Sequence, residues 1–299
     1  MATLYTHQDS NIRKTWLLMA VFFAVIVALG WFLSYYYDSP GILYFAVLFS
    51  IFSNVGSYWF SDKIVLKLTR ARSASEAQFH DLHNIVENLA MTAGLPKPRI
   101  FVIDDSAPNA FATGRNKERA AVAITTGLLG TLDRTELEGV IAHELSHIGN
   151  RDILLSTIVS VLAGLIIIAA DFFLRSHFWG LGGRRDGGRG GQAGAIIMII
   201  GFVFVILSPI IATLIQLAIS RKREFLADAS GALLTRYPEG LASALKKISQ
   251  YSKPMQNASN ATAHLFISNP FGAKAFSGVA KLFMTHPPVE ERIKALLRN

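Results

Sequence analysis

The residues best suited to chemistry form an H-E-x-x-H sequence near the middle of the chain, running from His143 to His147. If this stretch is helical, the two histidines lie one turn apart and point the same way. Two imidazoles on one helical face can hold a zinc ion, and Glu144 beside them is placed to take a proton from a metal-bound water. The sequence therefore predicts a catalytic metal site with Glu144 as its general base.

The flanking residues favour the helix that this site requires. Thr135, followed three residues later by Glu138, predicts a capping box at the helix start. Gly149 stands where the helix would end. An apolar face at helical spacing is formed by Leu137, Val140, Ile141 and Leu145.

A catalytic zinc site needs a third protein ligand and one open position. The chain has no cysteine, so this ligand must be a histidine or a carboxylate. The compact H-E-x-x-H-x-x-G-x-x-H arrangement does not apply, because Ile153 stands at the place of its last histidine. The downstream glutamates that remain as candidates are Glu224, Glu239, Glu290 and Glu291.

Glu224 is the preferred third ligand because of its position relative to two apolar blocks. It follows the block at Ala195–Ile219, whereas the H-E-x-x-H sequence precedes the block at about Ile153–Leu174. If these blocks form an antiparallel hairpin, their open ends bring Glu224 to the histidines. Asp228, one helical turn further on, is expected to accept a hydrogen bond from a zinc-bound histidine.

The composition is that of a membrane protein. The chain of 299 residues is 51% hydrophobic and 17% charged, and its apolar residues gather in four blocks. The net charge is +8, but the basic residues cluster beside the apolar blocks. Cations in that position face anionic lipid and set topology, so we expect a lipid bilayer as partner and no nucleic acid.

The four blocks predict an α+β membrane protein with about four transmembrane helices. Residues 1–60 form an N-terminal transmembrane hairpin, with spans at about Trp16–Tyr37 and Ile42–Phe60. Residues 61–152 form the first part of a catalytic domain with a small sheet. Residues 153–219 form a second hairpin that splits this domain, and residues 220–299 form its second part, with the third zinc ligand.

Three short apolar runs predict the strands of the small sheet, at Arg99–Asp104, Asn109–Gly114 and Ala120–Ile124. The second run is a candidate edge strand that pairs with an extended substrate, the alternative being an ordinary strand. Its residues are Asn109, Ala110, Phe111, Ala112, Thr113 and Gly114. His286, before Pro287, is a candidate to stabilise the oxyanion of the reaction, the alternative being a structural histidine.

Charge asymmetry predicts that the catalytic parts face the cytoplasm. Arg13 and Lys14, the basic cluster at Lys63–Arg72, and the run at Arg221–Arg223 all border apolar blocks on that side. The second connector also carries arginines, which contradicts a simple placement outside. Either the second hairpin does not cross the membrane fully, or its topology departs from the positive-inside rule.

Several ordered motifs make the chain resemble the HtpX family of bacterial membrane zinc endopeptidases, relatives of the CAAX prenyl proteases. These are H-E-L-S-H between two hydrophobic hairpins, R-x-x-E-F-x-A-D after the fourth block, N-A-F-A-T-G upstream and T-H-P-P near the end. The resemblance covers nearly the whole chain. It implies a gluzincin fold with one zinc, the ligands His143, His147 and Glu224, and Glu144 as catalytic base.

The resemblance also implies a role: cleavage of misfolded or damaged membrane proteins on the cytoplasmic side of the bacterial inner membrane, in quality control and stress response. Two other functions compete with this expectation. A CAAX-type prenyl-protein endopeptidase with an enclosed chamber needs more spans than four apolar blocks supply. A non-catalytic membrane protein with a structural metal has no need of Glu144.

Overall fold

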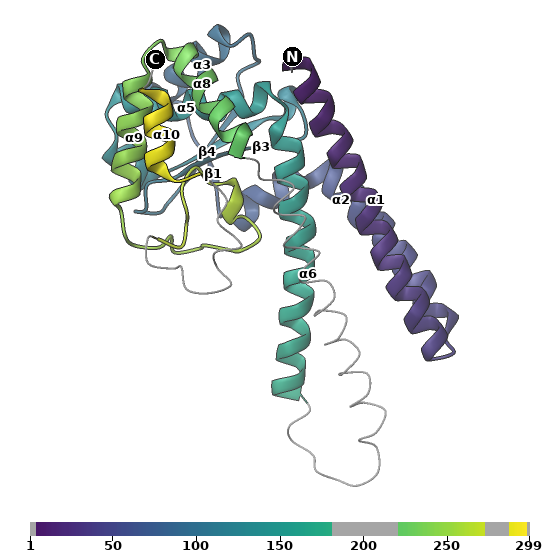
Figure 1. Cartoon of the computed structure of the whole chain (residues 1–299). Coiled ribbons are helices and arrows are strands. Elements are labelled where there is room, and N and C mark those ends of the chain that lie inside the picture. Colours follow the sequence, from purple (N-terminus) through teal and green to yellow (C-terminus); the bar gives the residue numbers. More distant parts are fainter. Residues whose placement is uncertain (1–3, 181–220, 273–286, 298–299) are drawn as a thin grey trace.

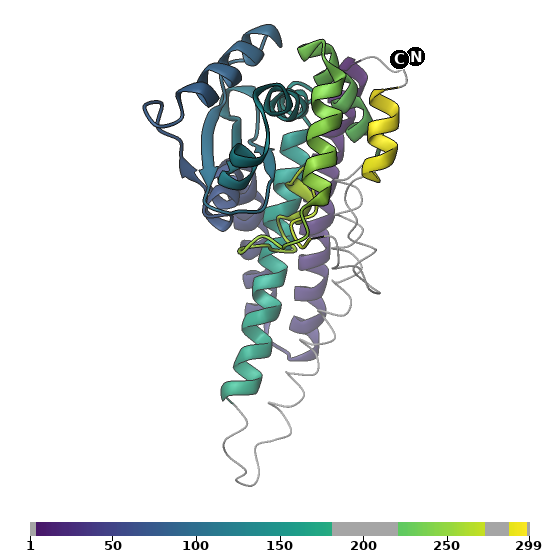
Figure 2. The same cartoon turned by 90° about the vertical axis from the view of Figure 1, so that its left-hand side faces the viewer.

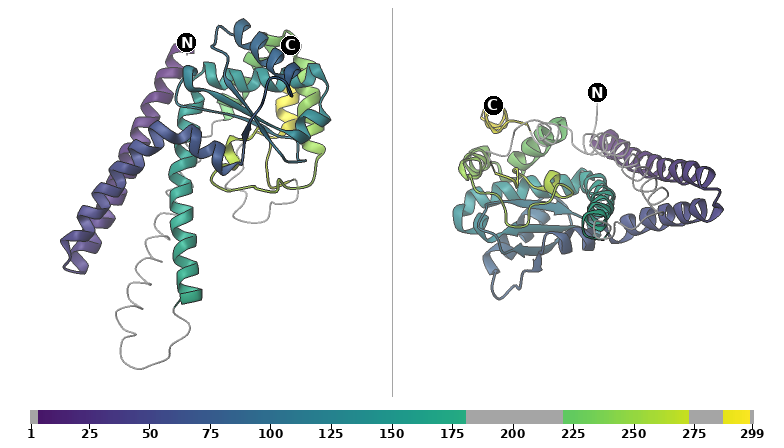
Figure 3. Two further views of the ribbon diagram at one scale, coloured as in Figure 1. Left: turned by 180° about the vertical axis from the view of Figure 1, so that it is seen from behind. Right: turned by 90° about the horizontal axis from the view of Figure 1, so that it is seen from below.

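Three long helices leave one side of a domain that is built around a small sheet (Figure 1). The computed structural model describes residues 4–180, 221–272 and 287–297. The long helices are α1 (Leu4–Tyr36), α2 (Pro40–Leu68) and α6 (Asp152–Gly180). The hairpin of α1 and α2 diverges from α6 as they extend away from the domain (Figure 3).

The helices α1 and α2 are long and apolar enough to cross a membrane, as expected for the first hairpin. Within the described residues, one further candidate joins α5 (Arg134–Gly149) to α6, which meet at an angle of 87°. The expected span at 195–219 lies outside the described residues. The structure therefore supports a membrane protein with two candidate spans, or three if the bent pair counts as one.

The sheet has four strands in the order β1-β2-β4-β3. The predicted strands are confirmed as β2 (Arg99–Ile103), β3 (Ala110–Thr113) and β4 (Ala121–Thr125), and the short β1 (Arg72–Ser73) joins them. Strands β2 and β4 are parallel, whereas β1 and β3 pair with their neighbours in antiparallel fashion. The sheet is thus mixed, and β3 lies at its edge.

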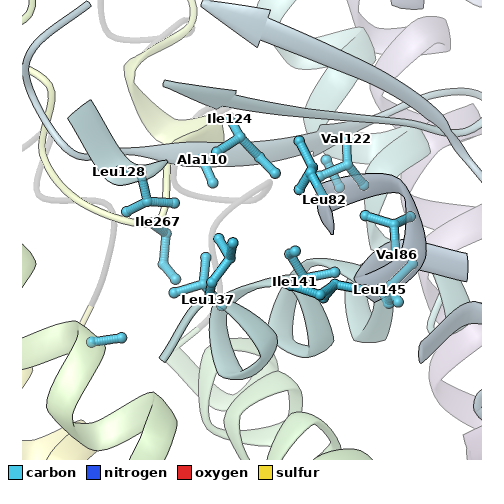
Figure 4. Packing of buried hydrophobic residues seen from close by; sticks show 14 of the residues in the cluster. Leu82, Val86, Ala110, Val122, Ile124, Leu128, Leu137, Ile141, Leu145 and Ile267 are labelled. Carbon is cyan, nitrogen blue, oxygen red and sulfur yellow. The ribbon is translucent and has the colours of Figure 1, made fainter. Parts of the chain in front are cut away.

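Alternate residues of β4 face two different cores, as the period of a strand requires. Val122 and Ile124 pack against α5 and α3 (His80–Thr92), where they meet side chains such as Ile141 (Figure 4). Ala121 and Ala123 pack on the opposite face, against the end of α2 and the segment near Phe266. The helix with the two histidines therefore rests on a sheet that is buried on both faces.

The start of α5 differs from the sequence prediction. The capping box is made by Asp133 and Glu136, not by Thr135 and Glu138, because the helix begins at Arg134. The Asp133 carboxylate accepts from the Glu136 amide at 3.0 Å, and the Glu136 carboxylate accepts from the Asp133 amide at 2.9 Å. Glu138 forms an exposed ion pair with Arg134 instead. The predicted end of the helix at Gly149 is confirmed.

Two glycines allow other helices to approach α5 closely on the side away from the sheet. These helices are α8 (Arg221–Thr235) and α9 (Pro238–Gln250), with α10 (Val289–Leu296) beside them (Figure 2). A Cβ atom on Gly139 would lie 2.7 Å from the backbone nitrogen of Leu241, and one on Gly231 would lie 3.0 Å from that of His143. The close approach at Gly231 brings Glu224, on the same helix, to the histidines.

We expect Gly139→Ala to destabilise the protein by about 1–3 kcal/mol, because α9 must shift to make room for the added methyl group. Gly130→Ala is the matched control, since a Cβ at Gly130 has no atom within 4 Å. Thermal unfolding in detergent measures both. Equal unfolding temperatures for the two variants would contradict the close packing of α5 and α9.

Candidate metal centre

Three side chains converge at the face of α5 that α8 covers. The Nε2 atoms of His143 and His147 lie 3.2 Å apart. Oε2 of Glu224 lies 3.8 Å from Nε2 of His143, and Oε1 of Glu224 lies 3.6 Å from Nε2 of His147. Ligand atoms around a tetrahedral zinc lie roughly 3.3 Å from one another, given bonds of about 2.0–2.1 Å. The donor set and its spacing therefore fit a zinc ion.

Two aspartates hold the outer nitrogens of the rings. His143 Nδ1 lies 2.9 Å from Asp228 Oδ1, and His147 Nδ1 lies 3.1 Å from Asp152 Oδ2. A carboxylate accepts hydrogen bonds, so each Nδ1 is the donor and each neutral ring turns the lone pair of Nε2 inward. Two lone pairs and a carboxylate facing one another favour a cation between them.

Arg292 of α10 holds Asp228 in place. Its guanidinium donates from Nε and Nη2 to the two carboxylate oxygens, at 2.8 Å and 2.6 Å. Both side chains are buried, so the pair is bidentate and shielded from water. Burial alone would raise the pKa of Asp228, but Arg292 and His143 outweigh it and lower that pKa to about 2. Asp228 is therefore an anion at every physiological pH.

The environments of the two histidines shift their pKa values in opposite directions. Burial lowers the pKa of His143 to about 4, although the hydrogen bond and charge of Asp228 act against it. Burial also opposes the charged form of His147, but the hydrogen bond to Asp152 and the nearby carboxylates, first that of Glu224, raise its pKa to about 9. Without a metal, His147 therefore carries a second proton and is a cation at neutral pH.

Glu144 is buried and lines a cavity of about 30 Å³ beside both histidines. A cavity of this size holds one or two water molecules but no peptide residue. Its remaining walls include Ala112 of β3 and, on another side, His264 and Ile267. The carboxylate is thus next to a space in which a water molecule can sit.

The expected edge strand runs past this cavity, but its residues differ in their surroundings. Ala112 lines the cavity. Ala110 accepts a hydrogen bond at its carbonyl from Ile267, at 2.9 Å, so part of the edge is already paired. The Phe111 ring packs on Phe266 in the core.

The other three residues of this run have structural contacts. The side-chain amide of Asn109 donates a hydrogen bond to the backbone carbonyl of Ser268 and accepts one from its backbone N–H. Thr113 lies 3.0 Å from the hydroxyl of Thr157 on α6. Gly114 has a φ of 138°, which few other residues adopt.

The remaining predicted site residues lie away from this cluster or outside the described residues. His286 lies outside the described residues. Glu239, Glu290 and Glu291 are exposed, and none belongs to the donor cluster found among the described residues. Sequence reasoning missed Asp152 and Arg292. Asp152 could have been found as the acid that follows His147 by five residues, whereas an arginine in the amphipathic last helix gives no local signal.

The known proteins to which this chain is similar are proteases. Residues 76–299 match the family model described as peptidase family M48. The protease HtpX homolog of Caldanaerobacter subterraneus is 50% identical over 296 residues, which are 98% of this chain and 97% of that protein. That of Pyrococcus furiosus is 49% identical over 285 residues, 95% of this chain and 94% of that protein. The crystal structure of S. mikatae Ste24p has a TM-score of 0.51 at 19% identity and covers 98% of this chain and 67% of that chain, a likeness of fold alone.

We expect zinc binding at pH 7 to release about one proton, because ligation needs neutral imidazoles and only His147 has a pKa above 7. Affinity should fall roughly tenfold per unit as the pH is lowered from 8 to 6, since zinc must displace one proton from His147 throughout this range. Calorimetry in two buffers of different ionisation enthalpy measures the proton count. A heat that is independent of the buffer would contradict the assignment.

Proposed function

Since this chain belongs to peptidase family M48, among the HtpX proteases, and is a membrane-bound metalloprotease, we propose that it is a zinc endopeptidase acting on misfolded or damaged membrane proteins in membrane quality control. The observation that carries the chemistry is the convergence of His143, His147 and Glu224, with Glu144 beside them. These three residues would hold one zinc per chain.

The proposed reaction is the hydrolysis of a peptide bond. When bound, zinc supplies Lewis-acid chemistry, which lowers the pKa of water and polarises a carbonyl. Glu144 accepts a proton from the attacking water and then delivers it to the leaving nitrogen. Asp228 and Asp152 fix the two imidazole rings, and Arg292 keeps Asp228 oriented and ionised. His286 remains a proposed stabiliser of the oxyanion.

The substrate is proposed to pair with β3, the edge strand of the sheet, so that its scissile bond lies beside the cavity. Ala112 supports this role because it lines the cavity. Two residues before it, the Ala110 carbonyl already accepts a backbone hydrogen bond from Ile267, so this edge of the strand can pair with an extended segment. The cavity of about 30 Å³ is too small for a peptide.

We further propose four membrane spans, with the second hairpin splitting the catalytic domain, and a cytoplasmic catalytic side at the bacterial inner membrane. The extension of α1, α2 and α6 from the same side of the domain supports this arrangement (Figures 1 and 2). So does the position of Glu224, which directly follows the fourth apolar block of the sequence. Charge asymmetry supports the orientation.

Glu144→Ala should abolish cleavage of an unfolded membrane protein in detergent while the bound zinc remains at one per chain. The loss should reach at least a hundredfold, because a positioned general base contributes about that much, and the other carboxylates that line the cavity, Asp152 and Glu224, are assigned to the metal centre. Glu138→Ala, on the same helix but in an exposed ion pair, is the matched control and should cleave normally. Cleavage by Glu144→Ala at the wild-type rate would rule out the mechanism.

Glu224→Ala should lose zinc, because two imidazoles alone leave half of the tetrahedral shell without a protein ligand. Metal analysis after dialysis measures the zinc content. Glu239→Ala, which removes an exposed glutamate, should keep one zinc per chain. Full zinc content in Glu224→Ala would show that another group supplies the third ligand.

A further inference from the structure

Asn11, near the start of α1, is buried at the base of the metal centre. Its amide nitrogen lies 2.6 Å from Asp152 Oδ1 and 3.3 Å from the backbone carbonyl of Asn150, and it donates to both. Its amide oxygen accepts from Arg223 Nη1 at 3.3 Å. One side chain therefore bonds the segment between α5 and α6 and also the residue that precedes Glu224.

The Asp152 carboxylate links this asparagine to a proposed zinc ligand. Its Oδ1 accepts from Asn11, while its Oδ2 accepts from Nδ1 of His147. The amide thus fixes the rotation of the carboxylate, and the carboxylate fixes the rotation of the imidazole. The chain of bonds runs from a membrane helix to the metal-binding face of α5.

We propose that Asn11 is a positioning residue of the metal centre, acting through Asp152 on His147, so that the first membrane helix completes the site. This inference rests on the proposed zinc site. It extends beyond the matched family segment, because Asn11 lies outside residues 76–299.

Anchoring of α1 does not by itself explain an asparagine here. Leu18, Met19 and Phe22 already pack against α6 in a buried apolar cluster. A buried amide stabilises the fold only when its hydrogen bonds are made. An apolar side chain could pack against a neighbouring helix without the free-energy cost of removing a polar group from water. Two of the bonds of Asn11 go to the charged groups of Asp152 and Arg223, and those residues adjoin His147 and Glu224.

The test measures zinc affinity by competition with a chelator, using the full chain in detergent. All variants carry Glu144→Ala, so that self-cleavage cannot remove them and no activity is needed. The compared changes are Asn11→Leu, which has nearly the same shape but no hydrogen bonds, Asp152→Ala, and the two together. Asn88→Leu makes the same substitution at an exposed asparagine of α3.

Asn11→Leu should weaken zinc binding about tenfold, as loss of an outer partner of a ligand does. In the Asp152→Ala background the same change should have almost no further effect, because the link to His147 is already broken. Asn88→Leu should bind like the parent. Thermal unfolding in excess chelator shows whether the variants are folded, and Asn11→Ala replaces Asn11→Leu if the larger side chain does not fit.

Two results would overturn the inference. One is a folded Asn11 variant that binds zinc like the parent, while Asp152→Ala does not. The other is a pair of losses that multiply in the double variant, as expected if Asn11 only stabilises the fold. If the parent itself binds no zinc, the proposed function fails first, so the two failures are distinguishable.

Discussion

Hydrogen bonds donated by the outer nitrogens of His143 and His147 to two aspartates set the geometry of the metal centre. They turn both Nε2 atoms inward, to a separation of 3.2 Å, where a carboxylate faces them. Such an arrangement is unfavourable for neutral rings unless a cation or a proton lies between them. Arg292 and Asn11 in turn hold the aspartates, so the orientation of each ring is fixed through two successive contacts.

The same contacts join the site to the membrane helices. Asp152 orients His147 and is also the first residue of α6, which leaves the domain at 87° to the histidine helix. The N-terminal part of α1 reaches the site through Asn11, and the C-terminal end of α2 covers one face of the sheet. The metal centre therefore lies where the domain and its long helices meet, which suits the proposed cleavage of membrane proteins.

Local patterns in the sequence were sufficient for the histidine helix, the three strands and Asp228, because one turn or one strand period determines which residues share a face. The contacts of Arg292 and Asn11 could not be predicted, since they join segments that are distant in the chain and show no local periodicity. The capping box was misplaced because Asp133 and Thr135 both suit the start of a helix, and only the packed helix selects between them. The pairing of β3 with Ile267 likewise depends on a segment that has no regular pattern of its own.

The central claim is that two imidazoles and one carboxylate hold a single zinc ion. X-ray absorption at the zinc edge of the purified protein tests it most directly, because imidazole ligands give a distinct scattering pattern. We expect two imidazole nitrogens and one or two further oxygen ligands at about 2.0–2.1 Å, with a changed spectrum in any protein that lacks Glu224. A first shell without imidazole, or the same spectrum in the absence of Glu224, would contradict it.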